Sequence, residues 1–305
     1  MSGSHAIGVD LGGTKILAGV VTRSGEILRR HERPTPHDSQ QAVLAELEAA
    51  VVELLDDEVA AIGFGIPSPI DQPRGVVVEC PNLPLADVPL RELMHTRFDL
   101  PVGLDNDANA AAIGEWRAGA GRGVDDLVML TMGTGLGGGV ISGGRPFRGS
   151  RGGGAELGHV VIVHDGRPCQ GACRGRGHLE AYVTGLAATA AAREAFGPAA
   201  DAHRLIRLAD EGDETARAIL AEIGGYLGSG MGSFANVFEP DLIVIGGGFG
   251  VVAWDYVIPH AEEAMRREAL RPMRDRVRVV RAELGTAAGS IGAAFVAFEA
   301  LDAGS

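Results

Sequence analysis

Residues 6–21 read AIGVDLGGTKILAGVV, in which the apolar runs 6–9 and 16–21 flank a turn that contains Gly12 and Gly13. Each run has the length and composition of a strand, so the stretch predicts two strands joined by a glycine turn. Residues 127–142 read LVMLTMGTGLGGGVIS and repeat the order of strand, glycine turn and strand. This repeat indicates two related lobes, each presenting a glycine turn to a shared cleft.

Glycine is unusually frequent and clustered. The chain has 46 glycines among 305 residues, about 15% against a usual ~7%, and 12 of the 26 positions from Gly133 to Gly158 are glycine. A further cluster, residues 246–248, follows the apolar run 242–245. Glycine after a strand lets backbone N–H groups face an anion. A plain tight turn explains any one cluster equally well, but three such strand ends favour ligand-binding loops.

The rest of the chain alternates between strand and helix patterns. Strands are expected at residues 60–66, 76–79 and 102–104, and helices at 39–55, 109–117, 180–196, 213–238 and 287–301. Asp38 followed by Gln41 resembles a capping box at the start of the first of these helices. Small residues in the helix at 213–238 are typical of close helix packing or bending. The alternation predicts an α/β fold with a largely parallel sheet.

Composition excludes several classes of protein. Lys and Arg number 27 against 40 Asp and Glu, a net charge of −13, which argues against a nucleic-acid partner because phosphates need a basic face. No apolar run reaches the ~20 residues that span a bilayer. Residues 1–5 lack the features of a secretory signal, and three cysteines form no disulfide framework. We expect a globular cytoplasmic protein with no membrane partner.

Three kinds of phosphate-binding loop are to be distinguished. A P-loop needs Gly-x4-Gly-Lys-Ser/Thr before a helix, whereas residues 12–15 lack that spacing and lead into a strand. Residues 133–138 fit Gly-x-Gly-x-x-Gly, but the strand-like run 140–142 follows, so no helix N-terminus meets a pyrophosphate. The remaining interpretation is a pair of strand–turn–strand clamps that close on a nucleoside triphosphate from both sides.

Five motifs now occur in order along the chain: DLGGTK at 10–15, GIP at 65–67, NDANAA at 106–111, GTGLGGG at 133–139 and ELGH at 156–159. Together they resemble the ROK family of sugar kinases and sugar-responsive repressors, bacterial glucokinases in particular. The resemblance covers residues 6–298. It implies the actin-like ATPase fold, also called ribonuclease-H-like, with two α/β lobes around a central cleft. We expect residues 1–115 to form one lobe and 116–305 the other, with the last helix packing back on the first lobe.

By this resemblance Asp107 is the base that takes a proton from the 6-hydroxyl of a hexose, and Asn106 holds neighbouring hydroxyls. The residues themselves leave an alternative open, because Asp and Asn also cap helices and a helix follows. Asp105 is expected to cap or to support the structure. The resemblance also assigns sugar contacts to a wider set of residues: Gly65, Asn106, Asp107, Glu156, His159 and Glu180. Ser68 departs from the family's Gly-Ile-Pro-Gly run and adds a side chain near the sugar.

The cofactors implied are ATP with Mg²⁺, and Asp10 is expected to contact the metal through water. Lys15 either adds a positive charge at the phosphates or points to solvent. The expected ATP-binding residues are Asp10, Gly12, Gly13, Thr14, Lys15, Gly133, Thr134, Gly135, Gly247 and Gly248. In so acidic a chain, Mg²⁺ and local amide dipoles must overcome the unfavourable overall field.

Four zinc-type ligands, His159, Cys169, Cys173 and His178, fall within 20 residues. The similar family motif reads Gly-His and then Cys-x-Cys-Gly-x-x-Gly-Cys-x-Glu. Here two residues are inserted between the first two cysteines, and His178 stands where the third is expected. Histidine binds Zn²⁺ equally well, so we expect a structural Cys₂His₂ zinc site. The alternative is two buried free thiols beside unrelated histidines.

These expectations lead to one main function, the ATP-dependent phosphorylation of a hexose, with glucose giving glucose 6-phosphate. The alternatives are a kinase for another hexose or N-acetylhexosamine, and a non-catalytic sugar-responsive transcriptional regulator. Only residues 1–5 precede the first expected strand, which disfavours an N-terminal helix-turn-helix domain. By resemblance we expect a homodimer or homotetramer.

Overall fold

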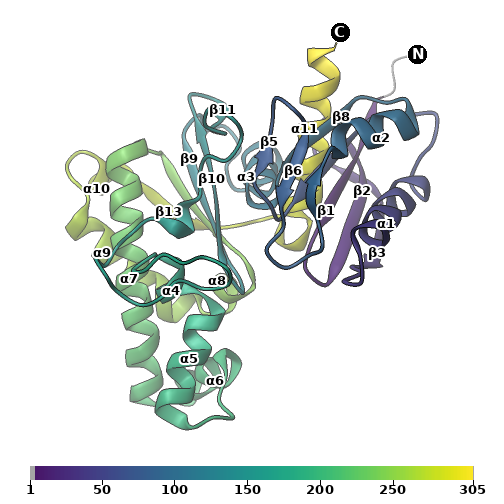
Figure 1. The fold of residues 1–305 in the computed structure, drawn as a ribbon. Coiled ribbons are helices and arrows are strands. Elements are labelled where there is room, and N and C mark those ends of the chain that lie inside the picture. The colour runs from purple at the N-terminus through teal and green to yellow at the C-terminus, as the bar shows by residue number, and fades with distance from the viewer. Residues whose placement is uncertain (1–3, 305) are drawn as a thin grey trace.

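The computed structural model describes residues 4–304 and shows two α/β lobes (Figure 1). Residues 1–3, part of the N-terminal stretch expected not to be a secretory signal, lie outside the described part of the chain. Within residues 4–304 no helix combines the length and the apolar character needed to cross a bilayer.

The first lobe is built on a five-stranded sheet. The order is β3 (Ile27–Pro34), β2 (Lys15–Thr22), β1 (His5–Leu11), β4 (Val59–Ile66) and β8 (Val102–Asn106). The strands β1, β4 and β8 run parallel, whereas β2 and β3 are antiparallel to their neighbours. The expectation of a largely parallel sheet is therefore wrong for the part formed by β1, β2 and β3. The glycine turn after β1 folds β2 back as an antiparallel hairpin.

The second lobe repeats this arrangement. Its sheet has the order β11 (Arg145–Pro146), β10 (Leu136–Ser142), β9 (Leu127–Met132), β12 (Leu242–Gly246) and β13 (Arg278–Arg281). The first three strands are again antiparallel and the last two join in parallel. The repeated strand–glycine–strand pattern in the sequence thus corresponds to the same strand order and direction in both sheets.

A small antiparallel sheet extends from the first lobe beside the carboxyl ends of β4 and β8. It consists of β5 (Ile70–Asp71), β6 (Val76–Glu79) and β7 (Ala86–Val88). The helices of the first lobe are α1 (Gln40–Val52), α2 (Leu90–Phe98) and α3 (Asp107–Ala118). The expected capping residue Asp38 is wrong. Ser39 is the N-cap of α1, and its side chain accepts a hydrogen bond from the Ala42 N–H.

Most helices belong to the second lobe, where α7 packs along α9. Their bounds are α4 (Glu180–Val183), α5 (Gly185–Phe196), α6 (Ala202–Asp210), α7 (Glu214–Phe238), α8 (Gly248–Val252), α9 (Trp254–Glu268), α10 (Met273–Arg276) and the 3₁₀ turns η1 (Leu157–His159) and η2 (Gly285–Ala287). Close packing explains the small residues of α7: a Cβ at Gly228 would lie 2.3 Å from the Ala261 carbonyl oxygen of α9.

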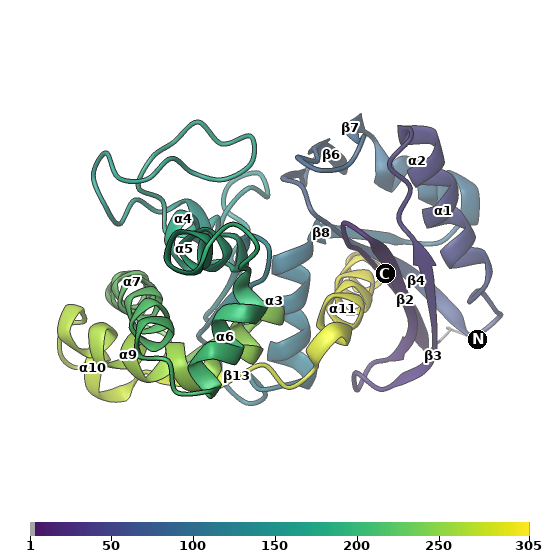
Figure 2. The ribbon, with the colours of Figure 1, turned by 90° about the horizontal axis from the view of Figure 1, so that it is seen from below.

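The last helix, α11 (Ala288–Ala303), lies against β1, β4 and β8 of the first sheet and along α3 (Figure 2). Gly8, Gly63 and Gly103 are paired across these strands. A Cβ at any of them would meet a carbonyl oxygen of α11 at 1.8 to 2.3 Å. This row of glycines lets α11 pack directly on the first sheet. The division of the lobes at residues 115–116 stays a prediction.

Candidate functional site

The NDANAA motif lies where β8 ends and α3 begins. Asn106 is the N-cap of α3, and its Oδ1 accepts hydrogen bonds from the N–H groups of Ala108 and Asn109 at 2.9 and 3.2 Å. The capping interpretation is therefore correct for Asn106. Capping uses only the amide oxygen, and the Nδ2 group donates to the Ser68 carbonyl oxygen at 3.5 Å.

Asp107 is the first residue of α3, and its Oδ1 accepts a hydrogen bond from the Ala108 N–H at 2.8 Å. Burial raises the pKa of the Asp107 carboxyl, and hydrogen bonds from Ala108 and Asn106 offset this only in part. A carboxylate whose pKa is raised is a better proton acceptor than an ordinary surface aspartate. Asp107 thus has the chemistry of a general base.

Two cavities meet at Asp107. One, of about 620 Å³, opens between the two lobes. It is lined by Pro67, Ser68, Pro69, Pro81, Asn82, Asn106, Asp107, Ala108, Thr131, Gly133, Gly135, Leu136, Gly137, Gly138, Gly153, Gly154, Glu156, His159, Glu180 and Gly247. Carboxylates, an amide and an imidazole converge there on a small volume, a pattern suited to a ligand with several hydroxyl groups.

The second cavity, of about 460 Å³, is also lined by Asp107. It extends from Asp10 past the glycines that follow β12 to the start of α11, and includes Gly246, Gly247, Gly248, Val251, Val252, Gly285, Thr286 and Gly289. Apolar walls beside a glycine turn suit a nucleobase and its sugar. Asp107, Ala108, Thr131 and Gly247 line both cavities.

Asp10 lies near the end of β1, just before the first glycine turn, and close to Asp107. Burial, and then the negative charge of Asp107, raise the pKa of the Asp10 carboxyl to about 7. The absence of a side chain at Gly289 of α11 leaves room for the Asp10 carboxylate, because a Cβ there would lie 2.3 Å from the Asp10 Oδ2. Two neighbouring carboxylates that destabilise each other's charge are a natural place for a divalent cation.

Glu156 and Glu180 reach the interlobe cavity from the second lobe. Burial raises the pKa of the Glu156 carboxyl; His159 lowers it, while Asp107 and Glu180 raise it further. Glu180, the first residue of α4, accepts a hydrogen bond from the Leu136 N–H at 2.9 Å. Glu180 therefore connects α4 to the glycine hairpin of β9 and β10.

The predicted helix at residues 180–196 is broken at Thr184. Its backbone is extended there, and its Oγ1 accepts a hydrogen bond from the Ala187 N–H at the start of α5. The Gly185 N–H donates to the Gly133 carbonyl oxygen at 2.9 Å. The break therefore docks the start of α5 on the turn after β9, which a continuous helix would not allow.

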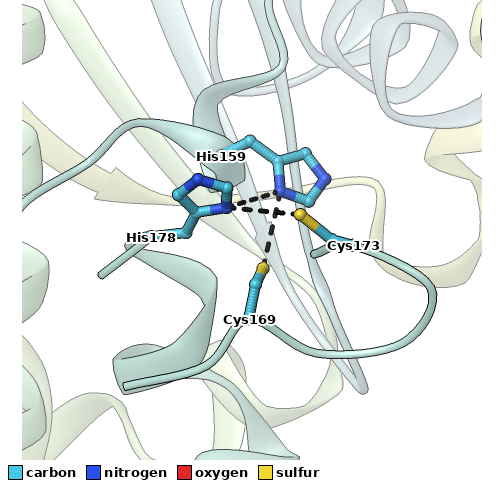
Figure 3. A group of neighbouring side chains, drawn as sticks. All are labelled: His159, Cys169, Cys173 and His178. Atoms are coloured by element: carbon cyan, nitrogen blue, oxygen red, sulfur yellow. Dashed lines mark hydrogen bonds between the residues drawn. The ribbon is translucent and has the colours of Figure 1, made fainter. Parts of the chain in front are cut away.

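The four predicted metal ligands converge (Figure 3). The Nδ1 atoms of His159 and His178 are 3.3 Å apart, Cys169 Sγ is 3.7 Å from His159 Nδ1, and Cys173 Sγ is 3.5 Å from His178 Nδ1. All four ligand atoms lie within 4.8 Å of one another. Burial, and then the neighbouring Cys173 and Glu180, raise the pKa of the Cys169 thiol to about 12.

These distances can be compared with a zinc coordination sphere. Tetrahedral Zn²⁺ with Zn–N of about 2.05 Å and Zn–S of about 2.3 Å puts its ligands about 3.3 Å (N to N) and about 3.6 Å (N to S) apart. The three shortest contacts match these values, and the donor set of two imidazoles and two sulfurs suits zinc. The cluster therefore fits a zinc ion.

One residue between the cysteines, Gln170, has a structural role. Gln170 donates through Nε2 to the Thr184 Oγ1 at 2.8 Å and to the Glu180 carbonyl oxygen at 3.3 Å. These bonds tie the Cys169–Cys173 loop to the junction of α4 and α5, which carries Glu180.

The structure does not place every predicted residue at the cavities. Gly65 lies beneath them, paired with Asp10 and Asp105 on the neighbouring strands. Gly12, Gly13, Thr14 and Thr134 lie outside the lining of both cavities. Lys15 also lies outside, and its Nζ pairs with Glu32 Oε2 at 3.1 Å.

Several lining residues were not predicted as ligand contacts. Asn82, in the loop between β6 and β7, and Thr131, near the end of β9, carried no local signal that separates them from ordinary loop and strand residues. Ser68 is buried, and its Oγ bonds to the backbone of Pro69 and Glu79. The hydroxyl of Ser68 therefore fastens the loop after β4 to β6.

Comparison with known proteins agrees with this geometry. The ROK family model matches residues 6–300. The glucokinase of Streptomyces coelicolor is 35% identical over 314 residues, covering 96% of this chain and 97% of the relative. Two solved structures align over almost their whole length. A ROK family glucokinase from Streptomyces griseus, in complex with glucose and AMPPNP, has a TM-score of 0.82 at 35% identity, covering 97% of this chain and 99% of its own. A ROK hexokinase from Thermus thermophilus has a TM-score of 0.85 at 36% identity, covering 98% and 99%.

The sequence motifs, the repeated strand order and these matches agree along nearly the entire chain. The chain belongs to the ROK family.

Proposed function

We propose that this protein is a glucokinase, which transfers the γ-phosphoryl group of ATP to the 6-hydroxyl of glucose. The observation that carries the proposal is the position of Asp107, a half-buried carboxylate shared by a polar interlobe cavity and a second cavity lined by glycine turns. A phosphoryl donor in one cavity and a hydroxyl acceptor in the other would meet beside this carboxylate. The similarity to glucokinases, one solved with glucose and an ATP analogue, supports these ligands.

Asp107 acts as the general base in this proposal. Its carboxylate takes the proton of the 6-hydroxyl as the sugar oxygen attacks the γ-phosphorus, and the bond to the β–γ bridging oxygen breaks to release ADP. Asp107 must be ionised to accept the proton. Because burial raises the pKa of Asp107, activity falls on the acid side at a higher pH than for an exposed aspartate.

The other residues of the interlobe cavity hold the sugar. The Asn106 Nδ2 group donates to one hydroxyl, and Glu156 and Glu180 each accept from adjacent hydroxyls, an arrangement that carboxylates perform well. His159 directs Nδ1 to the metal-type cluster, which leaves Nε2 for a sugar hydroxyl. Gly65 leaves room beside Asp107 for this arrangement.

ATP occupies the second cavity, with the nucleoside near Gly247 and Gly248 and the phosphates directed toward Asp107. Mg²⁺, when bound, neutralises the phosphate oxygens, and Asp10 is placed to hold it through water. The turn residues Gly12, Gly13 and Thr14 in one lobe and Gly133, Thr134 and Gly135 in the other supply N–H and hydroxyl donors to the phosphates. A Cβ at Gly13 would have no neighbour within 4 Å, so this turn has open space to approach a ligand as the lobes close.

The Cys₂His₂ cluster holds a structural zinc ion in this proposal. It lies in a segment with little apolar content, residues 149–177, where η1 is the only regular element. Holding His159 in place there fixes one wall of the sugar cavity.

The test is an assay of sugar-dependent ADP release with a panel of acceptors and donors. With ATP as the donor, the acceptors compared are glucose, mannose, fructose, N-acetylglucosamine and N-acetylmannosamine. With the best sugar as the acceptor, ATP and polyphosphate are then compared as donors. We expect glucose to give the highest kcat/KM. Absence of sugar-dependent ADP release with every acceptor would refute a kinase, and preference for another sugar would refute glucokinase.

Two further expectations remain proposals. A kinase that draws on cellular ATP belongs in the cytoplasm, which fractionation of producing cells tests. A homodimer or homotetramer is expected by family resemblance, which light scattering after gel filtration tests.

A further inference from the structure

The chain passes between the two sheets twice. Residues 119–126 lead from α3 to β9, and residues 282–287 lead from β13 to α11, which lies on the first sheet. We call these two stretches the crossing segments. Any movement of one lobe relative to the other must bend them, since they are the covalent links between the sheets.

Glu115 joins both crossing segments. It lies near the end of α3, and its side chain is fully buried. Its Oε2 accepts hydrogen bonds from the Ala120 N–H at 2.9 Å and the Glu283 N–H at 3.1 Å, and its Oε1 accepts from the Leu284 N–H at 2.8 Å. One carboxylate thus satisfies three backbone donors, and the two in the second crossing segment are more than 160 residues from Glu115 in sequence.

The surroundings are fitted to this carboxylate. A Cβ at Gly119 would lie 2.1 Å from the Glu115 Oε2, so no side chain can stand there. The next residue, Trp116, donates its indole N–H to the Val124 carbonyl oxygen at 2.8 Å, within the first crossing segment. The last turn of α3 therefore holds both segments, whereas the ion pair between them, Arg122 with Glu283 at 3.5 Å, is exposed.

We infer that Glu115 is a positioning residue for lobe closure, which holds the two crossing segments together so that they bend as one unit. This inference rests on the proposed function only in assuming that a sugar draws the lobes together. Charged acceptors make the stronger hydrogen bonds to backbone N–H groups, and a buried donor left without a partner is costly. With Glu115 intact, the backbone around Ala120, Glu283 and Leu284 stays fixed and only the remaining residues of the crossing segments bend. The catalytic groups of the two lobes then meet in one arrangement.

Glu115→Gln is the informative variant because it preserves size. The glutamine has one oxygen in place of two, so its NH₂ group must face a backbone N–H on one of the two sides. We expect the closed form to be less populated, so that KM for glucose rises about fivefold or more and kcat falls with it. Arg122→Gln, which removes the exposed contact between the same segments, is the matched control and should leave both constants within about twofold.

Closure of the two lobes can be measured by fluorescence, without catalysis. The chain has two tryptophans, and Trp254→Phe leaves Trp116, on the last turn of α3, as the sole reporter. In this background glucose should change the fluorescence of the parent and of the Arg122→Gln protein at similar concentrations, and that of Glu115→Gln only at several-fold higher ones. An unchanged KM and an unchanged fluorescence titration in a folded Glu115→Gln protein would overturn the inference.

A second measurement applies if Glu115→Gln does not fold. Hydrogen exchange of the unmodified protein should show the amides of Ala120, Glu283 and Leu284 strongly protected both with and without glucose, above those of Arg122 and Gly123. Rapid exchange of the three amides in either state would overturn the inference. Absence of sugar-dependent ADP release in the unmodified protein would instead refute the proposed function. Hydrogen exchange of the three amides would still test whether Glu115 holds the crossing segments together.

Discussion

Arg148 and Asp105 form an ion pair across the two lobes. Arg148 follows β11 in the second lobe and donates through Nε to the Asp105 Oδ2 at 2.6 Å, and its Nη2 donates to Glu299 of α11 at 2.7 Å. Asp105 is fully buried at the end of β8, where its Oδ1 accepts from the Asn106 N–H and the Asn109 Nδ2. The pair thereby fixes the turn that carries Asn106 and Asp107.

Replacing Arg148 with methionine should destabilise the protein and impair catalysis. Asp105 would stay buried without its cationic partner, and breaking such a pair costs about 3 kcal/mol. Denaturant unfolding measures this loss, and kcat should fall because the turn before Asp107 loses its support. Arg151→Met removes a more exposed pair with Asp71 and should destabilise the protein much less. Equal destabilisation by the two changes would contradict this account.

Asp107→Asn should reduce kcat by a factor of about 10² to 10⁴, the usual contribution of a general base. Asparagine preserves the shape of the side chain and does not accept the proton, so glucose affinity should stay within about tenfold. Steady-state kinetics and calorimetric titration with glucose measure the two effects. Turnover that survives largely intact would mean that another group is the base.

The raised pKa of Asp10 predicts how stability depends on pH. An unfolded aspartate has a pKa near 3.9, whereas burial and Asp107 raise the pKa of Asp10 to about 7 in the folded protein. Between these values the folded state binds a proton that the unfolded state releases, so stability falls as pH rises from about 4 to 7. Asp10→Asn should flatten this dependence. Denaturant midpoints without Mg²⁺ or nucleotide measure it, and an unchanged slope in the variant would contradict the assignment.

Zinc content tests the Cys₂His₂ cluster. Protein purified without chelators should contain about one equivalent of zinc by elemental analysis. His178→Ala should lower this content and the thermal midpoint, because the metal orders a segment with little core of its own. His164→Ala, an exposed histidine of the same segment outside the cluster, is the control and should keep the metal. Less than about one-tenth of an equivalent in the unmodified protein would count against the site.

The sequence determined those features that depend on neighbours along the chain. Strand runs that end in glycine fixed both hairpins, and the cap formed by Asn106 follows from its place before a helical segment. The cysteines and histidines fall within 20 residues, so a short loop brings them together. In each case the interaction is local, and spacing is enough to predict it.

Only the tertiary structure decided the features that join distant parts of the chain. The ion pair of Arg148 with Glu299 spans 151 residues, and the hydrogen bond from Leu284 to Glu115 spans 169. The row of Gly8, Gly63 and Gly103 depends on strand register, and the break at Thr184 depends on contact with the turn after β9. Such partners are chosen by how lobes, sheets and helices pack, and local propensity carries no information about which distant group a side chain will meet.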